Sequence, residues 1–495
     1  MKYYSTRDKS LRMDAAQAIK MGLSRDGGLL TPCEIPQVDG EFLRTLIPAS
    51  YQERAARVMT LYLTDYTEAE LREFAGNAYG ADKYDTPAVA PVRTVDETTH
   101  CLELWHGPTS AFKDMALQML PQLLSASLRK TGEDKTACIL VATSGDTGKA
   151  AMEGFADVPQ TKILVFYPKD GVSAVQEQQM VTQEGANVDV CSVAGNFDDT
   201  QSGVKRIFSD ESIRTALDGR GYFLSSANSI NWGRILPQVV YYISAYCDLV
   251  RDSRISMGDK VNFCVPTGNF GDILAAYYAK RMGLPVGRLI CASNCNNVLT
   301  DFLRTGIYDR NRPFHNTMSP SMDILISSNL ERLLFDLSGG DDGEVRRCME
   351  SLAAAGRYEV SDSVKACLRD QYWGGFCDEA GTAATIAEYY KKHRYLIDPH
   401  TAVAANVMEQ YRGGTGDKTV TVFVSTASPY KFCDHVLEAV GEAPESRGVE
   451  LIEQLQHFSG VPAPKRLAAL KGKKRRFERS VERDDMENAV LVFLK

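Results

Sequence analysis

The sequence predicts an α/β protein in which two doubly wound parallel-sheet domains enclose a ligand cleft, with a mainly helical N-terminal domain in front of them. Short apolar runs that indicate buried strands alternate with amphipathic stretches, at residues 137–142, 162–167, 188–193 and 222–224. A second block of such runs lies at residues 261–265, 289–292 and 420–424. This alternation is typical of parallel sheets with helices on both faces. Because ligands bind at the strand ends of such sheets, we expect a site between the two blocks.

The N-terminal part has a different pattern. Residues 11–23 and 52–75 have helical spacing and are separated by turn signals such as Asp26-Gly27-Gly28. The sequence therefore predicts a helical domain at residues 1–98 and two α/β domains at residues 99–255 and 256–440. The second α/β domain contains a helical insertion near residues 303–371, and residues 441–495 form a C-terminal tail without an assignable motif.

Composition restricts the class of protein. The chain has 495 residues, of which 24% are charged and 44% hydrophobic, as in ordinary soluble globular proteins. The formal net charge of -8 argues against a nucleic-acid partner, since phosphate affinity needs clustered Lys and Arg. One basic run, at residues 471–476, is followed by acidic residues and is predicted to be a solvated surface segment.

The cysteines and histidines do not form metal-binding patterns. The 12 cysteines are scattered without a C-x-x-C pair, and the 7 histidines form no metal pair, so we expect no metal site. Free thiols are typical of a reducing compartment. The sequence also shows no leader segment and no apolar run of about 18 residues, which predicts a cytoplasmic protein without a membrane span.

Lys113 is the first candidate for chemistry. It follows the turn His106-Gly107-Pro108-Thr109 and is expected in the first turn of an apolar helix. Burial and the positive end of the helix dipole both disfavour its ammonium form, which would make the amine nucleophilic. A lysine whose stem packs beside a core helix while its charge reaches water is the structural alternative.

Two loops after predicted strands have the composition of anion-binding sites. In the first, Gly268-Asn269-Phe270-Gly271-Asp272, glycines let the backbone approach a ligand, and amides at a helix start attract an anion. The second, Ser144-Gly145-Asp146-Thr147-Gly148, offers hydroxyl groups and amides for a carboxylate. Plain turns and helix caps are the alternatives. The similar loop at residues 195–198 lacks the second glycine, and Lys149 does not complete a P-loop.

A third polar group, at residues 228–234, ends in Arg234. Asn228, Ser229 and Asn231 place amides and a hydroxyl near its guanidinium, which suits bidentate contact with a phosphate. Capping plus a surface ion pair is the alternative. His400, which follows Asp398-Pro399, is predicted to be a capping or packing residue.

From about Tyr3 to about Phe432 the chain resembles the threonine synthase family. The motifs occur in the family's order: HGPTSAFKDMALQ, TSGDTGKAA, FYPKDGVSAVQEQQM, AGNFDDTQ, NSINWGRILPQ, PTGNFGDILA, SPSMDIL, DPHTA and STASPYKF. The resemblance implies the two-lobed fold of tryptophan synthase β and its relatives, and pyridoxal 5'-phosphate bound as a Schiff base to Lys113.

The resemblance also implies roles for the other candidates. The phosphate of the cofactor would be bound by Gly268, Asn269, Phe270, Gly271 and Asp272, and its pyridine nitrogen by Thr426. The carboxylate of the substrate would be bound by Ser144, Gly145, Asp146 and Thr147, and its phosphate by Asn228, Ser229, Asn231 and Arg234. The family more often has His where Ser428 stands.

The expected reaction is therefore that of threonine synthase, a lyase acting on phosphates: O-phospho-L-homoserine and water give L-threonine and phosphate. One alternative is a related lyase, such as a threonine or serine dehydratase or an O-acetylserine-type synthase, whose substrates carry no phosphate. Another is a catalytically silent relative that only binds ligands. A small-molecule substrate is expected as the partner, and both a monomer and a homodimer remain open.

Overall fold

A computed structural model describes residues 1–169 and 171–494, without the side chain of residue 198. Its first large sheet has five strands in the order β16-β8-β7-β6-β9, all paired in parallel. The strands expected in this part of the chain are confirmed. Their bounds are β6 Thr136–Ala142, β7 Thr161–Pro168, β8 Val188–Ala194, β9 Tyr222–Ser225 and β16 Ser480–Glu482.

The second large sheet has six strands in the order β14-β11-β10-β15-β5-β4, and only the edge strand β4 is antiparallel. The runs predicted at residues 261–265, 289–292 and 420–424 are confirmed as strands here. The bounds are β4 Val92–Thr94, β5 Thr99–Glu103, β10 Val261–Pro266, β11 Val286–Ser293, β14 Tyr372–Phe376 and β15 Thr421–Ser425.

Side chains of each sheet alternate between two apolar layers. In β6, Cys138 and Leu140 pack with α9, α10 and α22, whereas Ile139 and Val141 face the central core. In β10, Cys264 packs towards α17, α18 and α19, whereas Phe263 faces that central core. Both sheets are therefore covered on both faces, which confirms the doubly wound α/β class.

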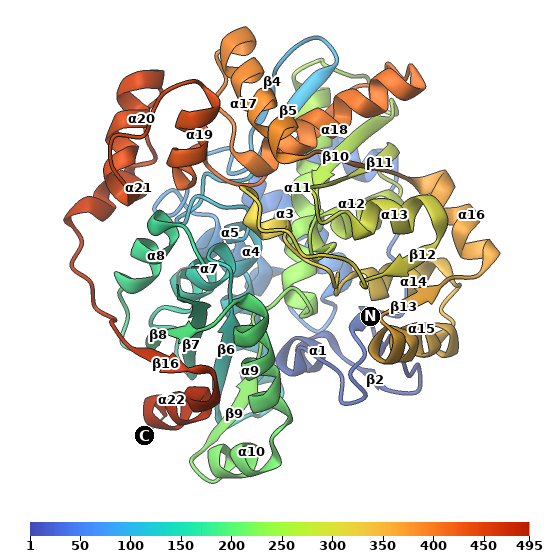
Figure 1. The fold of residues 1–495 in the computed structure, drawn as a ribbon. Helices are drawn as coiled ribbons and strands as arrows, with labels where there is room; N and C mark the ends of the chain where they lie inside the picture. Colours follow the sequence, from blue (N-terminus) through green and yellow to red (C-terminus); the bar gives the residue numbers. More distant parts are fainter. Residues whose placement is uncertain (170, 495) are drawn as a thin grey trace.

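The helix α11 Trp232–Arg251 runs through the middle of the molecule and is buried almost throughout (Figure 1). It packs against α3, α5 and α12, so it joins the N-terminal part to the rest. The helices between the sheets and on their outer faces are α5 Asp114–Leu117, α6 Leu120–Lys130, α7 Asp146–Phe155, α8 Ala174–Val181, α9 Phe197–Ser209, α10 Glu211–Asp218, α12 Gly271–Arg281, α13 Val298–Thr305, α17 Glu379–His393, α18 Pro399–Thr415 and α19 Cys433–Ala439.

The N-terminal part is mainly helical, as predicted, with a small antiparallel sheet. The range 52–75 is divided between two helices, and the range 11–23 contains a short strand before its helix. The elements are β1 Tyr3–Ser5, β2 Arg12–Met13, β3 Leu30–Pro32, α1 Ala15–Met21, α2 Gly40–Leu46, α3 Tyr51–Tyr62 and α4 Glu68–Ala78.

We expected a single helix after Lys113. This prediction is wrong, because the chain forms two helices there, α5 and then α6. Pro121 lies in the first turn of α6, and since proline has no N–H it cannot continue the hydrogen bonds of α5. The neighbouring helix α7 packs closely against the interruption between α5 and α6. A Cβ added to Gly154 would lie 1.9 Å from the Leu117 carbonyl oxygen, so only glycine fits there.

The insertion contains strands besides the predicted helices, and the C-terminal segment, to which no motif could be assigned, also forms regular elements. The insertion has the helices α14 Leu330–Leu337, α15 Asp342–Ala355 and α16 Asp362–Gln371, but also the antiparallel pair β12 Ile307–Asp309 and β13 Arg357–Glu359. The segment after residue 440 is no loose tail. Its elements are α20 Leu451–Ser459, α21 Lys465–Ala468, β16 and α22 Met486–Phe493. They run down the left side of the molecule in Figure 1, and β16 extends the first sheet.

Sheet membership therefore does not follow chain order. The strand β5 precedes Lys113 in the sequence, yet it lies in the second sheet beside β15. The strand β16 comes from the end of the chain, yet it pairs with β8 of the first sheet. Because β5 belongs to the second sheet, the segment that carries Lys113 starts at the second sheet and continues to helices of the first.

Candidate active site

Lys113 is anchored to the end of β15. The amide of Phe112 donates to the Thr426 carbonyl at 2.7 Å, and Ala111 forms an isolated bridge with Ala427. Lys113 is the N-cap of α5, one position before the first turn in which we expected it. Its side chain is half-buried, with Nζ 4.5 Å from the centre of the Phe112 ring.

Burial lowers the pKa of Lys113 to about 8. Among the neighbouring charges, Asp146 and Asp272 raise this pKa, whereas the cations Arg234 and Lys431 lower it further. The predicted helix dipole contributes little, because α5 has only 4 residues. About a tenth of Lys113 is therefore a neutral amine at pH 7, far more than for an ordinary lysine, and a nucleophile or a base requires this neutral form.

The loop after β6 places Asp146 beside Lys113. Gly145 has a φ of 126°, and a Cβ there would lie 2.4 Å from the Gln176 side chain. Asp146 begins α7, where its Oδ1 accepts a hydrogen bond from Gln176 Nε2 at 2.8 Å and pairs with Lys431 Nζ at 2.6 Å. The carboxylate is therefore neutralised within the protein. The Gly145 amide is also committed, because it donates to Thr143 Oγ1 at 2.9 Å. Among the residues predicted to bind the substrate carboxylate, this leaves Ser144 and Thr147 as the candidate donors.

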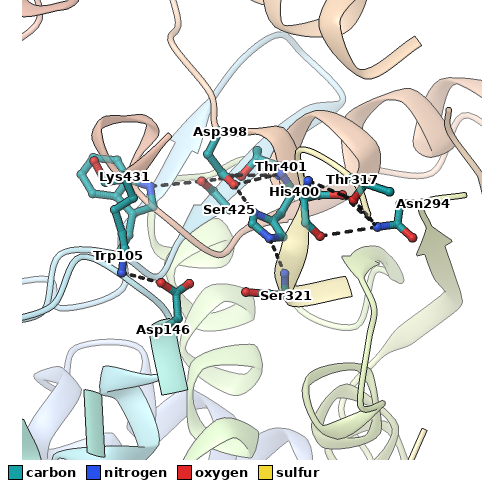
Figure 2. A network of polar contacts seen from close by, with 12 residues as sticks. Trp105, Asp146, Asn294, Thr317, Ser321, Asp398, His400, Thr401, Ser425 and Lys431 are labelled. Carbon is teal, nitrogen blue, oxygen red and sulfur yellow. Dashed lines mark hydrogen bonds and ion pairs between the residues drawn. The ribbon is translucent and has the colours of Figure 1, made fainter. Parts of the chain in front are cut away.

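Lys431 was not predicted. It is fully buried and pairs with Asp146 (Figure 2). Its Nζ also donates to the Thr109 carbonyl at 3.1 Å. Although burial raises the pKa of Asp146, the charges of Lys431 and Lys113 hold it well below its usual range. The motif STASPYKF contains this lysine, but no local spacing points to it, because its partner lies in the other sheet.

The loop Gly268 to Asp272 joins β10 to α12. Phe270 has a left-handed φ of 62°, and a Cβ on Gly268 would lie 2.7 Å from the Ser321 carbonyl oxygen. The backbone amides of residues 268–272 donate to no acceptor within the described part of the chain. They form a cradle of free donors, as an anion site requires.

The similar loop at residues 195–198 is different. The Asn196 side chain accepts from the Asp199 amide at 2.9 Å, and the Asp199 side chain accepts from the Asn196 amide at 3.0 Å. This capping box uses the donors that an anion would need. The side chain of Asp198 lies outside the described residues.

Asp272 points away from its own loop. Its Oδ1 accepts hydrogen bonds from the hydroxyls of Tyr241 and Tyr242 on α11, the second at 2.6 Å. Burial raises the pKa of Asp272 to about 6, against the effects of these hydroxyls and of Lys113. The backbone amide of Asp272 is thus one of the free donors of the cradle, whereas its carboxyl group is hydrogen-bonded to tyrosines of α11.

The polar residues between 228 and 234 have two different roles. Asn231 caps α11 with Oδ1, and its Nδ2 donates to the Ile19 carbonyl at 3.0 Å, so its amide is committed to the fold. Arg234 is buried and donates through Nη1 to the Ala227 carbonyl at 2.8 Å. Its Nε has no partner, and no carboxylate pairs with it within the described residues. Burial lowers the pKa of Arg234 to about 10.

A buried guanidinium without a counterion is costly, so this position favours an anionic ligand. The half-buried residues Asn228 and Ser229 lie in the same loop. A Cβ on Gly271 would lie 3.7 Å from that of Ser229, so this loop adjoins the cradle at the start of α12.

Thr426 directly follows β15 and lies next to a hydrogen-bond network. Ser425 Oγ accepts from Trp105 Nε1 at 3.1 Å and lies 3.0 Å from Thr401 Oγ1 (Figure 2). In the part of the chain that the structure describes, the Thr426 hydroxyl has no hydrogen-bond partner. Ser428 caps a short turn instead, accepting from the Tyr430 amide at 3.4 Å.

His400 is a buried packing residue in the first turn of α18, where Asp398 and not His400 caps the helix. Its amide donates to Asp398 Oδ1 at 2.9 Å, and its Nδ1 lies 2.7 Å from the same oxygen. Its Nε2 accepts from the Ser321 amide at 3.1 Å, which fixes the segment that covers Gly268 (Figure 2).

Residues 1–169 and 171–494 hold neither a cluster of metal ligands nor a membrane-spanning helix. They contain no group of three or more His, Cys, Asp or Glu arranged for a metal ion. Nor does any helix among them combine the length and the apolar character that crossing a membrane requires.

The pair between Lys431 and Asp146 generates a stability prediction. We expect Lys431→Met to lower the free energy of unfolding by about 3–5 kcal/mol at pH 7, because it leaves a buried carboxylate without a counterion. Asp146 has a depressed pKa in the folded state, so its contribution is present above its unfolded pKa and is lost as pH falls through the folded one. The deficit of Lys431→Met should therefore shrink in acid. Urea denaturation measures both effects.

The control is Lys471→Met, which removes an exposed pair with Glu453 and should cost less than about 1 kcal/mol. In a double-mutant cycle, Lys431→Met with Asp146→Asn should lose much less than the sum of the single variants. Additive losses would contradict a direct interaction between the two side chains.

Known protein families match three parts of this chain. Residues 2–79 match the family model described as "Threonine synthase N terminus", residues 93–427 match "Pyridoxal-phosphate dependent enzyme", and residues 401–490 match "Threonine synthase, C-terminal". Threonine synthase of Pseudomonas aeruginosa is 40% identical over 446 residues, which cover 90% of this chain and 92% of that protein.

Two further relatives extend the comparison. Human threonine synthase-like 1 is 40% identical over 436 residues, or 86% of this chain, and the chain spans 58% of the length of that protein. The crystal structure of PLP-bound threonine synthase from Brucella melitensis has a TM-score of 0.88 at 39% identity, with 100% of both chains covered. The chain therefore belongs to the threonine synthase family of pyridoxal-phosphate-dependent enzymes.

Proposed function

We propose that this chain is a carbon–oxygen lyase that converts O-phospho-L-homoserine and water to L-threonine and phosphate, with pyridoxal phosphate on Lys113. The observation that carries the proposal is Arg234, a buried guanidinium without a carboxylate, next to a lysine whose amine is partly neutral. One anion loop and one unpaired cation suit a cofactor phosphate and a separate substrate phosphate.

The residues present fit the cofactor. The free amides of residues 268–272 suit its phosphate, the Lys113 amine its aldehyde carbon, and the Thr426 hydroxyl its ring nitrogen. When bound, pyridoxal phosphate supplies an electron sink for negative charge at the α and β carbons of the substrate.

Lys113 moves the protons. With a pKa of about 8, it can accept a proton from the α carbon of the substrate and later return one without a large energy penalty in either state. The hydrogen bond from the Phe112 amide to the Thr426 carbonyl fixes the backbone of Lys113 relative to the end of β15. Proton transfers at neighbouring carbons therefore need only rotations of its side chain.

The remaining groups orient the substrate and receive its leaving group. Ser144 and Thr147 at the start of α7 would bind the substrate carboxylate, and Gly145 shapes the turn that presents them. Lys431 neutralises Asp146 there, which removes a repulsion. Arg234, with Ser229 and Asn228, stabilises the charge that develops on the departing phosphate. The Asn231 amide is occupied by the fold, so we assign it to positioning this loop.

The alternatives are less well supported. A dehydratase or an O-acetylserine-type synthase acts on substrates without phosphate, which would leave Arg234 without an anion. A silent relative would not need a lysine whose pKa is lowered. We also propose a cytoplasmic location, since the 12 cysteines are free thiols.

The first test is direct. Purified protein with pyridoxal phosphate should release phosphate and form threonine from O-phospho-L-homoserine in equal amounts. Borohydride reduction followed by peptide mass mapping should locate the pyridoxyl group on Lys113, and Lys113→Ala should abolish both signals. An adduct on Lys149 or Lys280, or ammonia release without phosphate, would refute the proposal.

The second test concerns the substrate phosphate. We expect Arg234→Ala to lose about 2–4 kcal/mol of transition-state stabilisation in kcat/KM, while the cofactor absorbance remains intact. Arg234→Lys should restore activity only in part, because an ammonium lacks the planar fork. The exposed Arg129→Ala is the control. Loss of the cofactor from Arg234→Ala, or an unchanged kcat/KM, would return Arg234 to a structural role.

A further inference from the structure

We propose that the Asn329 carboxamide is a further phosphate-binding donor, at the place where the loop 268–272 meets the loop 228–234. This inference rests on the proposed function and adds a residue to its anion site. Asn329 immediately precedes α14 and is fully buried. Its backbone amide donates to the Asn269 carbonyl at 3.1 Å, so its position is tied to the cradle.

The orientation of the carboxamide is fixed by Arg332. The Arg332 guanidinium is also buried, and its Nη1 donates to Asn329 Oδ1. Because a guanidinium has donors but no acceptor, the oxygen of the amide must face it and Nδ2 must face the opposite way. Arg332 itself is held by the Leu30 carbonyl at 2.8 Å and by the Ile230 carbonyl at 2.6 Å.

Asn329 Nδ2 is buried without a hydrogen-bond partner. It lies 3.4 Å from the place where a Cβ on Gly271 would stand, and the Ser229 Cβ lies 3.7 Å from that same place. The donor is therefore directed to the junction of the two loops. Leaving a buried amide donor unpaired costs free energy, which an acceptor on a bound ligand would recover.

The surroundings specify the kind of acceptor. The cradle amides, the Ser229 hydroxyl and the unpaired Arg234 Nε are all able to donate hydrogen bonds. A ligand group that only accepts, with several oxygens and negative charge, matches such a set of donors. A phosphate monoester has this chemistry. Both the cofactor and the substrate carry one, so the experiment must distinguish the two sources.

The test compares Asn329→Asp and Asn329→Ala with the exposed control Asn77→Asp. Asn329→Asp keeps the oxygen that faces Arg332 but replaces the donor with a repelling oxygen, and Asn329→Ala only removes the donor. The measurements are the Kd of the apoprotein for pyridoxal phosphate, the KM for O-phospho-L-homoserine, and inhibition by inorganic phosphate.

We expect one phosphate affinity to fall about tenfold or more in Asn329→Ala, and further in Asn329→Asp. A weaker Kd for pyridoxal phosphate with unchanged KM assigns the donor to the cofactor. A raised KM and weaker phosphate inhibition with unchanged cofactor affinity assign it to the substrate. Either result supports the proposal, whereas folded variants that keep both affinities within twofold would overturn it.

Two further measurements keep the test decisive. If neither variant folds, a crystal structure of the wild-type protein with pyridoxal phosphate and inorganic phosphate decides, and a distance above 3.5 Å from Asn329 Nδ2 to every phosphate oxygen overturns the proposal. A wild-type protein that binds pyridoxal phosphate but forms no threonine would refute the proposed function alone, since the affinities for pyridoxal phosphate and inorganic phosphate still test Asn329.

Discussion

The buried ion pair between Lys431 and Asp146 is the contact on which the arrangement of the site depends. Asp146 follows a strand of the five-stranded sheet, and Lys431 follows a strand of the six-stranded sheet. The same ammonium group binds the Thr109 carbonyl in the segment before Lys113. One desolvated charge thus joins both sheets and the lysine segment. Because breaking such a pair leaves a buried charge without a partner, separation of the sheets at this point is strongly disfavoured.

The pair also determines the charge balance around Lys113. Lys113, Lys431 and Arg234 are opposed by Asp146 and Asp272, and burial raises the pKa of Asp272 towards its neutral form. The site is therefore short of negative charge, and ligands with phosphate and carboxylate groups would restore the balance. The buried donors of Arg234 and Asn329 also lack acceptors, which a bound ligand would supply.

The sequence allowed the prediction of the fold class and of most strands, because apolar runs such as residues 137–142 are buried on both sides. It did not indicate β5, where Thr99, His100 and Glu103 interrupt the apolar pattern, or β16, which depends on pairing with β8. The loops at residues 144–148 and 268–272 could be recognised from glycines near strand ends. Lys431, the place of Asn329 beside the loop 268–272 and the contact of Asn231 with Ile19 could not, because each depends on contacts between distant segments. The ligand roles of the site residues remain predictions.

Burial among cations keeps the Lys113 amine partly neutral, and the proposed roles of this lysine as nucleophile and base depend on that. The most direct measurement is the pH dependence of Lys113 labelling by an amine-reactive reagent in the apoprotein, followed by peptide mass spectrometry. A lowered folded-state pKa means that labelling should reach half its maximum near pH 8. A midpoint near the ordinary lysine value of 10.5 would contradict the account.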